Sequence, residues 1–128
     1  MLSQRALQLD AASTLLTALE ALLRVHDFDA FETAVPLVDL LQLDGRERRE
    51  QLARMYLRRG FLESAADEWI AAIHERPDAQ AFVGLAQVAV ANQLPEEALD
   101  FVHAALDLEP EHHEARRLSD ALERRLAA

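Results

Sequence analysis

The second half of the sequence repeats itself with a period of about 33 residues, which is the length of a helix-pair unit. Shifting the chain by that amount superimposes six residues on identical or similar ones, including a proline. The matched pairs are Leu52 and Leu85, Ala53 and Ala86, Ala65 and Ala98, Ala72 and Ala105, Ile73 and Leu106, and Pro77 and Pro110. A unit this short cannot bury its apolar face alone, so its copies are expected to stack on one another.

Glycine and proline divide the chain into segments of helical length. Gly45, Gly60, Pro77, Pro95 and Pro110 separate stretches of about 12 to 16 residues in which apolar residues recur with a helical period. No segment alternates with period two and β-branched residues are sparse, so no strand is expected. The predicted fold class is all-α, with helices near residues 3–25, 28–42, 46–59, 62–75, 78–92, 95–108 and 111–126. Their short connections favour antiparallel neighbours.

The spacing inside each copy resembles the tetratricopeptide repeat (TPR) family. The first copy reads Leu52, Ala53, Tyr56, Gly60, Ala65, Trp69, Ala72 and Pro77, with Arg49 in place of a leading aromatic residue. The second reads Phe82, Leu85, Ala86, Ala89, Ala98, Val102, Ala105 and Pro110, and departs from the pattern at Ala89, Gln93 and Val102. The resemblance implies a right-handed α-solenoid of about three antiparallel helix pairs with a C-terminal capping helix.

Each position in the pattern has a physical reason. Small residues such as Ala53 and Ala65 are expected where the helices of a pair cross, because they allow a close approach. Trp69 is expected to fill space between helices rather than to bind a ligand. Gly60 is expected to take the left-handed conformation that ends a helix, and Pro95 fits the first turn of the next one.

A single domain is expected over residues 1–128. Regular repeats take residues 46–78 and 79–111. Residues 1–45 hold an N-terminal helix and a degenerate repeat, which Glu32 and Pro36 fit poorly. Residues 112–128 are expected to cap the last apolar face, because Leu118, Leu122 and Leu126 share one side of a helix.

The composition excludes several classes of protein. The chain has no cysteine, which removes disulfide scaffolds, thiol catalysis and Cys-ligated metal sites. A net charge of -10 argues against a nucleic-acid binder. No apolar run is long enough for a membrane helix and no signal peptide is evident, so a cytoplasmic location without membrane contact is expected. All basic residues are arginine, which with abundant Ala and Leu indicates a bacterial coding bias.

Catalytic and cofactor motifs are missing from the sequence. It has no Gly-rich phosphate loop, no His-Glu-x-x-His and no Gly-x-Ser-x-Gly, so we expect no enzyme activity and no cofactor. The adjacent His112 and His113 are flanked by carboxylates, but neighbouring residues of a helix point about 100° apart. We therefore expect solvated histidines rather than a metal site. A metal- or ligand-binding protein remains a third alternative.

The TPR resemblance also implies a binding groove. In TPR proteins the first helices of successive pairs line a concave groove that receives an extended peptide or a helix. Carried over by position, the groove residues are Glu47, Glu50, Arg54, Leu57, Gln80, Val83, Gln87 and Val90, with His113, Arg116 and Asp120 on the capping helix. A carboxylate clamp of Lys and Asn is rejected, because the chain has no Lys and Asn92 does not match. We expect a mixed groove with an apolar centre at Val83 and Val90, or else merely exposed residues.

Two further surfaces are candidates for interaction. The first is a basic island of Arg46, Arg48, Arg49, Arg54, Arg58 and Arg59. It attracts an acidic partner or another copy, or, as we favour, forms an ordinary salt-bridged surface with Glu47 and Glu50. The second is the N-terminal helix, where Leu2, Leu9, Leu16 and Leu23 recur at intervals of seven. This stripe suggests a homodimer or packing on a neighbouring domain.

The interpretation we favour is a non-enzymatic protein-interaction module that binds a peptide or helix of a partner. The alternative, from the same resemblance, is an accessory or oligomerisation domain of a larger bacterial enzyme such as a glycosyltransferase. An open reading frame that continues beyond either end of the chain would favour the alternative.

Overall fold

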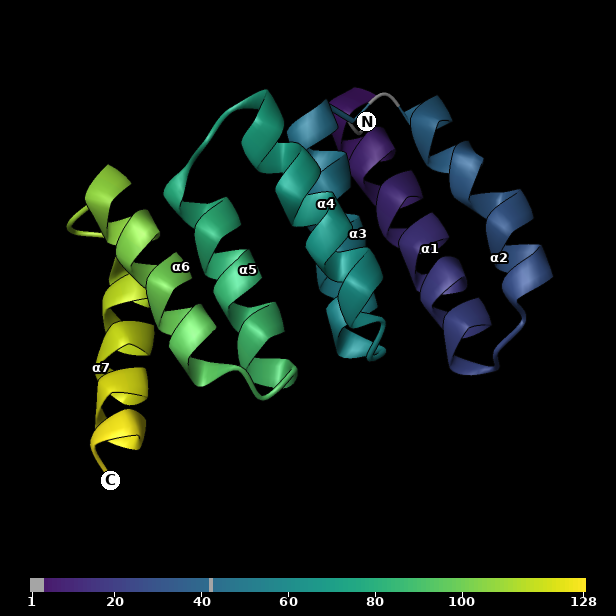
Figure 1. The fold of residues 1–128 in the computed structure, drawn as a ribbon. Helices are drawn as coiled ribbons and strands as arrows, with labels where there is room; N and C mark the ends of the chain where they lie inside the picture. The colour runs from purple at the N-terminus through teal and green to yellow at the C-terminus, as the bar shows by residue number, and fades with distance from the viewer. Residues whose placement is uncertain (1–3, 42) are drawn as a thin grey trace.

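The computed structural model describes residues 4–41 and 43–128, and every regular element among them is helical. The elements are α1 (Gln4–Arg24), α2 (Phe28–Ala34), the 3-10 helix η1 (Val35–Leu41), α3 (Gly45–Arg58), α4 (Leu62–Glu75), α5 (Ala79–Ala91), α6 (Pro95–Leu108) and α7 (His113–Ala127). The helices follow one another across the molecule from α2 at one end to α7 at the other (Figure 1). The predicted all-α class is confirmed. None of these helices is both long and apolar enough to cross a membrane.

The helix predicted for residues 28–42 is wrong in its second half. The α-helical part ends at Ala34, and the chain continues as the 3-10 helix η1. Pro36 is the cause, since its nitrogen carries no hydrogen to donate to the carbonyl of Glu32 one turn earlier. The other helices lie within two residues of their predicted bounds.

The same turn joins the two helices of three successive pairs. A residue with positive φ ends α1, α3 and α5, namely His26 (63°), Gly60 (83°) and Gln93 (61°). In each turn, the following residue donates its N–H to the carbonyl five residues earlier at 2.9 Å, as from Asp27 to Leu22. This pattern satisfies carbonyls that a helix end leaves free. The left-handed Gly60 is therefore confirmed, and two non-glycine residues share its conformation.

Small residues bring the regular helices together. α3 packs on α4, α5 on α6, and α4 and α6 each contact the following helix. The three pairs of alanines that the repeat superimposes are fully buried: Ala53 and Ala86, Ala65 and Ala98, and Ala72 and Ala105. They include the positions that the repeat predicted for close helix crossings, and each lies in a core cluster with residues of the neighbouring helices.

Trp69 packs against a glycine of the next helix. Its side chain is 1% exposed, and a Cβ added to Gly84 on α5 would lie only 2.1 Å from Trp69 Cε2. The indole therefore occupies the space that a side chain at position 84 would need. This confirms Trp69 as a packing residue.

The first helix pair uses large side chains at the corresponding positions. Three buried residues of this pair lie 34 positions before Ala53, Ala65 and Ala72, namely Leu19, Phe31 and Val38. They share a core cluster with Leu52 and Met55 of α3. Neither α2 nor η1 makes an extensive contact with α3 within the described residues, whereas α4 packs closely on α5.

Side chains at regular intervals cap the N-termini of α3, α5 and α7. Asp44 and Asp78 accept hydrogen bonds from backbone N–H groups of the first helical turn. His112, one repeat further along, does the same through Nδ1, which accepts from the N–H of Ala115 at 3.1 Å. Each cap satisfies a donor that the helix itself leaves free.

Candidate functional site

The odd-numbered helices form a continuous row. α1 contacts α3, α3 contacts α5 and α5 contacts α7. No comparably extensive contact joins α2 to α4 or α4 to α6 in the described part of the chain. We call the surface of α1, α3, α5 and α7 the odd-helix face. Among the described residues, one hollow lies between α1 and α3 of this face and another between α5 and α7.

The first hollow lies between α1 and α3 and has a volume of about 380 Å³. Polar and apolar side chains share its lining: Ser13, Leu16, Thr17, Glu20, Leu43, Glu47, Gln51 and Arg58. The residues from α3 fall on one stripe of the helix, since positions 47, 51 and 58 recur at helical spacing. Arg54 lies on the same stripe and is exposed.

The second hollow lies between α5 and α7 and has a volume of about 670 Å³. It is lined by Gln87, Glu114, Arg117, Leu118, Asp120, Ala121 and Arg124. Gln87 Nε2 donates to Glu114 Oε1 at 2.6 Å and so ties the two helices across the hollow. Arg117 and Arg124 are exposed and form no ion pair within the described residues.

The structure brings only part of the predicted groove together. Glu47 lines the first hollow and Gln87 lines the second, with Asp120 of the capping helix beside it. The other predicted residues line neither hollow: Glu50, Arg54, Leu57, Gln80, Val83, Val90, His113 and Arg116.

The predicted apolar centre at Val83 and Val90 is wrong. Val83 is 0% exposed and packs in the core cluster with Val102 and Ala105 of α6. Val90 packs against the edge of that cluster. The prediction failed because successive residues of a helix point about 100° apart. An error of one residue in the phase of the helix therefore places a core residue such as Val83 on the surface.

The prediction that Arg116 lines the groove is wrong for the same reason. It pairs with Glu111 Oε2 at 2.9 Å, while the adjacent Arg117 lines the second hollow. Leu57 is partly buried and packs against the cluster around Trp69.

Most residues of the first hollow were absent from the predicted groove. Extending the repeat one unit upstream would have found two of them, Ser13 and Glu20. Glu20 stands 34 positions before Arg54, which in turn stands 33 positions before Gln87. Ser13 has the same relation to Glu47. The signal was the repeat period itself, extended into the degenerate unit.

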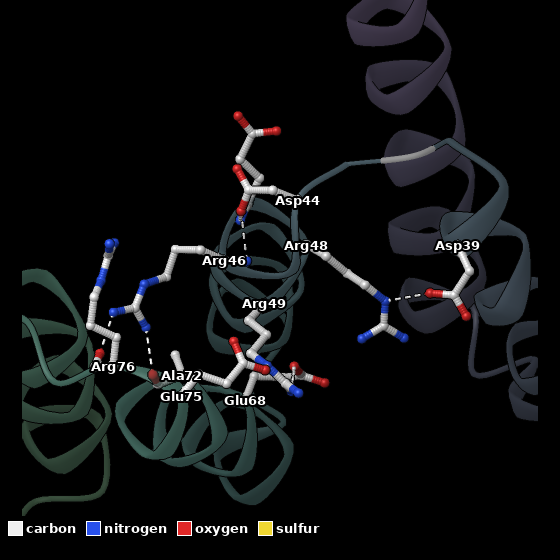
Figure 2. Close-up of polar contacts among 10 residues, drawn as sticks. Asp39, Asp44, Arg46, Arg48, Arg49, Glu68, Ala72, Glu75 and Arg76 are labelled. Atoms are coloured by element: carbon white, nitrogen blue, oxygen red, sulfur yellow. Dashed lines mark hydrogen bonds and ion pairs between the residues drawn. The ribbon is translucent and has the colours of Figure 1, made fainter.

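Arg46 binds the end of α4 and the start of α5. Its guanidinium donates to the carbonyls of Ala72, at 2.7 Å, and Arg76 (Figure 2). It also donates to Asp78 Oδ2 at 2.8 Å. The two carbonyls belong to a helix end, where such groups lack partners within the helix. Arg46 is thus a structural residue at the junction of two repeats.

Arg48 and Arg49 pair with carboxylates on either side of α3. Arg48 Nε lies 2.8 Å from Asp39 Oδ1 of η1, and Arg49 lies 2.7 Å from Glu75 and 3.4 Å from Glu68, both of α4 (Figure 2). Burial raises the pKa of Glu68, with the charges of Arg48 and Arg49 opposing that shift.

Tyr56 lies near this group of charges. Burial of its phenol raises the pKa of Tyr56, and the negative charge of Glu68 raises it further.

Arg58 and Arg59 join α3 to α1. Arg58 Nη2 lies 2.7 Å from Glu20 Oε1, and Arg59 Nε lies 3.4 Å from Glu20 Oε2. The hydrogen bonds from Arg58 are the main reason that the pKa of Glu20 is lowered, and the charges of Arg58 and Arg59 add to it.

The basic island is therefore mostly paired within the molecule. The carboxylates in its ion pairs belong to other elements: Glu20, Asp39, Glu68, Glu75 and Asp78. Arg54 alone of the six arginines has no hydrogen bond or ion pair within the described residues.

Two predicted features remain, the histidines as an alternative metal site and the leucine stripe of the N-terminal helix. No group of three or more His, Asp or Glu residues suited to a metal ion occurs in the part of the chain that the structure describes. Leu2 and the side chain of Leu9 lie outside the described residues. Leu23 is buried in the first pair and Leu16 lines the first hollow, so half of the leucine stripe serves the molecule's own packing.

Comparison with protein-family models gives no match, and comparison with curated proteins gives none either.

Proposed function

We propose that the chain is a TPR-like α-solenoid whose odd-helix face binds a peptide or helix of a partner protein, without catalysing a reaction. The repeat units are residues 46–78 and 79–111, a degenerate unit over 1–45 and a capping helix over 112–128. The shared turn geometry of three helix pairs and the continuous row of odd helices support this architecture.

The observation that carries the proposal is the pair of hollows on one row of helices. They have mixed polar and apolar linings, which is typical of surfaces that fix a ligand's orientation through a few polar groups. Arg54, Arg117 and Arg124 add cations on the same face that no carboxylate of the described chain neutralises. A partner segment with carboxylates fits such a face through electrostatic complementarity.

Charge reversal tests this proposal. The double substitution Arg54→Glu and Arg117→Glu should abolish capture of partners from a lysate of the native cells, as measured by affinity purification and mass spectrometry. Both side chains are exposed, so the circular-dichroism melt should stay unchanged.

The matched control is the double substitution Arg76→Glu and Arg125→Glu. It makes the same change of charge at exposed arginines that line neither hollow. Equal losses in the two double variants would show that net charge alone matters, and retained capture in the first would place binding elsewhere.

A further inference from the structure

An aromatic cleft opens between the first helix pair and the rest of the molecule. It has a volume of about 410 Å³ and shares no residue with the two hollows of the odd-helix face. Its lining residues come from α1, α2, η1, α3 and the start of α4: Leu23, Phe28, Phe31, Glu32, Val35, Pro36, Tyr56, Phe61 and Ser64. We propose that this cleft binds the guanidinium group of an arginine side chain presented by a partner protein.

Two pairs of aromatic rings build the cleft. Phe28 and Phe61 meet edge to face with ring centroids 5.8 Å apart, and Phe31 and Tyr56 do so at 5.9 Å. Edge-to-face pairing leaves ring faces available beside ring edges, and a cation is attracted to the face of an aromatic ring. Phe28 is 44% exposed, so the cleft has an accessible wall.

The repeat indicates that a planar group fits here. Val35, which lines the cleft, stands 34 positions before Trp69, so its side chain holds the register that the indole holds in the next repeat. Trp69 fills its own site completely, whereas the smaller Val35 leaves room. A guanidinium is planar and stacks on aromatic rings, which an ammonium group cannot do.

The charge around the cleft selects a cation. Glu32 lines it, is exposed, and has no ion pair within the described residues. Three of the five elements that line the cleft, α2, η1 and α4, contain no arginine or lysine. On α4, Asp67 is exposed and lies one turn beyond Ser64, so a second free carboxylate stands near the rim.

Four arginines on α3 and at its C-terminal end are already engaged. Arg48, Arg49, Arg58 and Arg59 pair with carboxylates of other helices. These four arginines are not available to the cleft, and we assign the occupant to another molecule. A second copy is also able to offer arginines, since Arg117 and Arg124 on α7 are unpaired among the described residues.

The test is a titration followed by heteronuclear NMR, with an acetylated and amidated peptide of sequence Gly-Ser-Arg-Ser-Gly. Its arginine should shift the amide signals of Phe28, Phe61 and Ser64. The same peptide with citrulline, a planar but neutral analogue, should bind about tenfold more weakly, because it retains the shape and loses the cation–π and charge interactions. The lysine peptide should also bind more weakly than the arginine peptide.

Two variants connect the binding to the cleft. Phe28→Ala should weaken the arginine peptide about tenfold and Glu32→Gln about threefold. The control Glu97→Gln, at an exposed carboxylate on α6, should leave affinity unchanged. Circular dichroism of each variant checks that the fold is retained.

Equal affinity for the arginine and citrulline peptides would overturn the proposal, as would shifts confined to other helices. Sedimentation of the protein without peptide measures whether it associates with a second copy. Self-association that Phe28→Ala abolishes would identify a second copy as the occupant and would also overturn it. Since the hollows share no residue with the cleft, failure here leaves the charge-reversal test of the odd-helix face unaffected.

Discussion

The first helix pair and the α5–α6 pair begin from the same turn but pack differently. Both connect their helices through a left-handed residue and the same hydrogen bonds, at His26 in one and Gln93 in the other. The first pair then buries Leu19 and Phe31 where the regular repeats bury alanine. The turn therefore sets the helix pairing, while side-chain size sets how closely the next helix can approach. Where it cannot approach closely, the aromatic cleft and the first hollow remain.

The largest effect is expected from emptying the core of the first pair. Phe31→Ala should lower the free energy of unfolding by about 4 kcal/mol, because it removes a buried aromatic ring from the interface with Tyr56 of α3. Urea denaturation measures the change. Phe28→Ala is the control and should cost about 1 kcal/mol or less, since that ring is half exposed. Equal costs would mean that the first pair has no distinct core.

The next largest effect is expected where the regular repeats are tightest. Gly84→Ala should cost about 2 to 3 kcal/mol, because the added Cβ would lie 2.1 Å from the ring of Trp69. Adding Trp69→Val, which installs the residue found at the equivalent position 102, should recover part of that loss. A double-mutant cycle in urea measures the coupling, and strictly additive costs would contradict the contact.

A smaller effect is expected from the shared turns. Gln93→Gly should stabilise the protein by about 1 kcal/mol, because glycine adopts positive φ without steric cost. Gly60→Ala should cost about the same amount, and no neighbouring atom lies within 4 Å of the added Cβ to confuse the result. Thermal melting of both variants checks the signs. Two shifts in the same direction would show that the turns are not equivalent.

The smallest effect is expected in the pH dependence. The pKa of Glu20 is lowered, so its stabilising contribution is present above pH 4.5 and is lost as the pH falls through its folded pKa. The pKa of Glu68 is raised, so its contribution has the opposite slope: stability increases as the pH falls through that raised pKa. Glu20→Gln should flatten the acid loss of stability and Glu68→Gln should steepen it, each by under about 1 kcal/mol. Urea denaturation at several acidic pH values measures the free energy of unfolding of each variant. If the environments of Glu20 and Glu68 were alike, the two variants would show the same slope of this free energy against pH.

Local sequence signals predicted most of the fold. Helix bounds followed from glycine and proline, and the alanines of the close crossings followed from the repeat. The left-handed conformations of His26 and Gln93 had no such signal, because neither is glycine and the hydrogen bonds of the turn hold them there. The 3-10 helix at Pro36 was not predicted; the sequence indicated only that Pro36 fits the repeat pattern poorly.

The candidate site was less predictable. Deciding whether Val83 faces the core or the solvent required the phase of the helix to within one residue, which boundaries known only to a few residues do not provide. Several arginine partners are distant in sequence, 19 positions for Arg49 with Glu68 and 38 for Arg58 with Glu20, so only the folded chain brings them together. The role of His112 as a helix cap was also missed, because histidine is an uncommon residue at that position.

The most direct test of binding by the odd-helix face is site-specific photo-crosslinking. A photoreactive phenylalanine replaces Gln87, which lines the second hollow, or Asp100, which is exposed on α6 away from both hollows. The chain is then irradiated in a lysate of the native cells, and crosslinked proteins are identified by mass spectrometry. We predict a discrete partner crosslinked from position 87 and none from position 100. The same partner crosslinked from position 100 and not from position 87 would contradict the account.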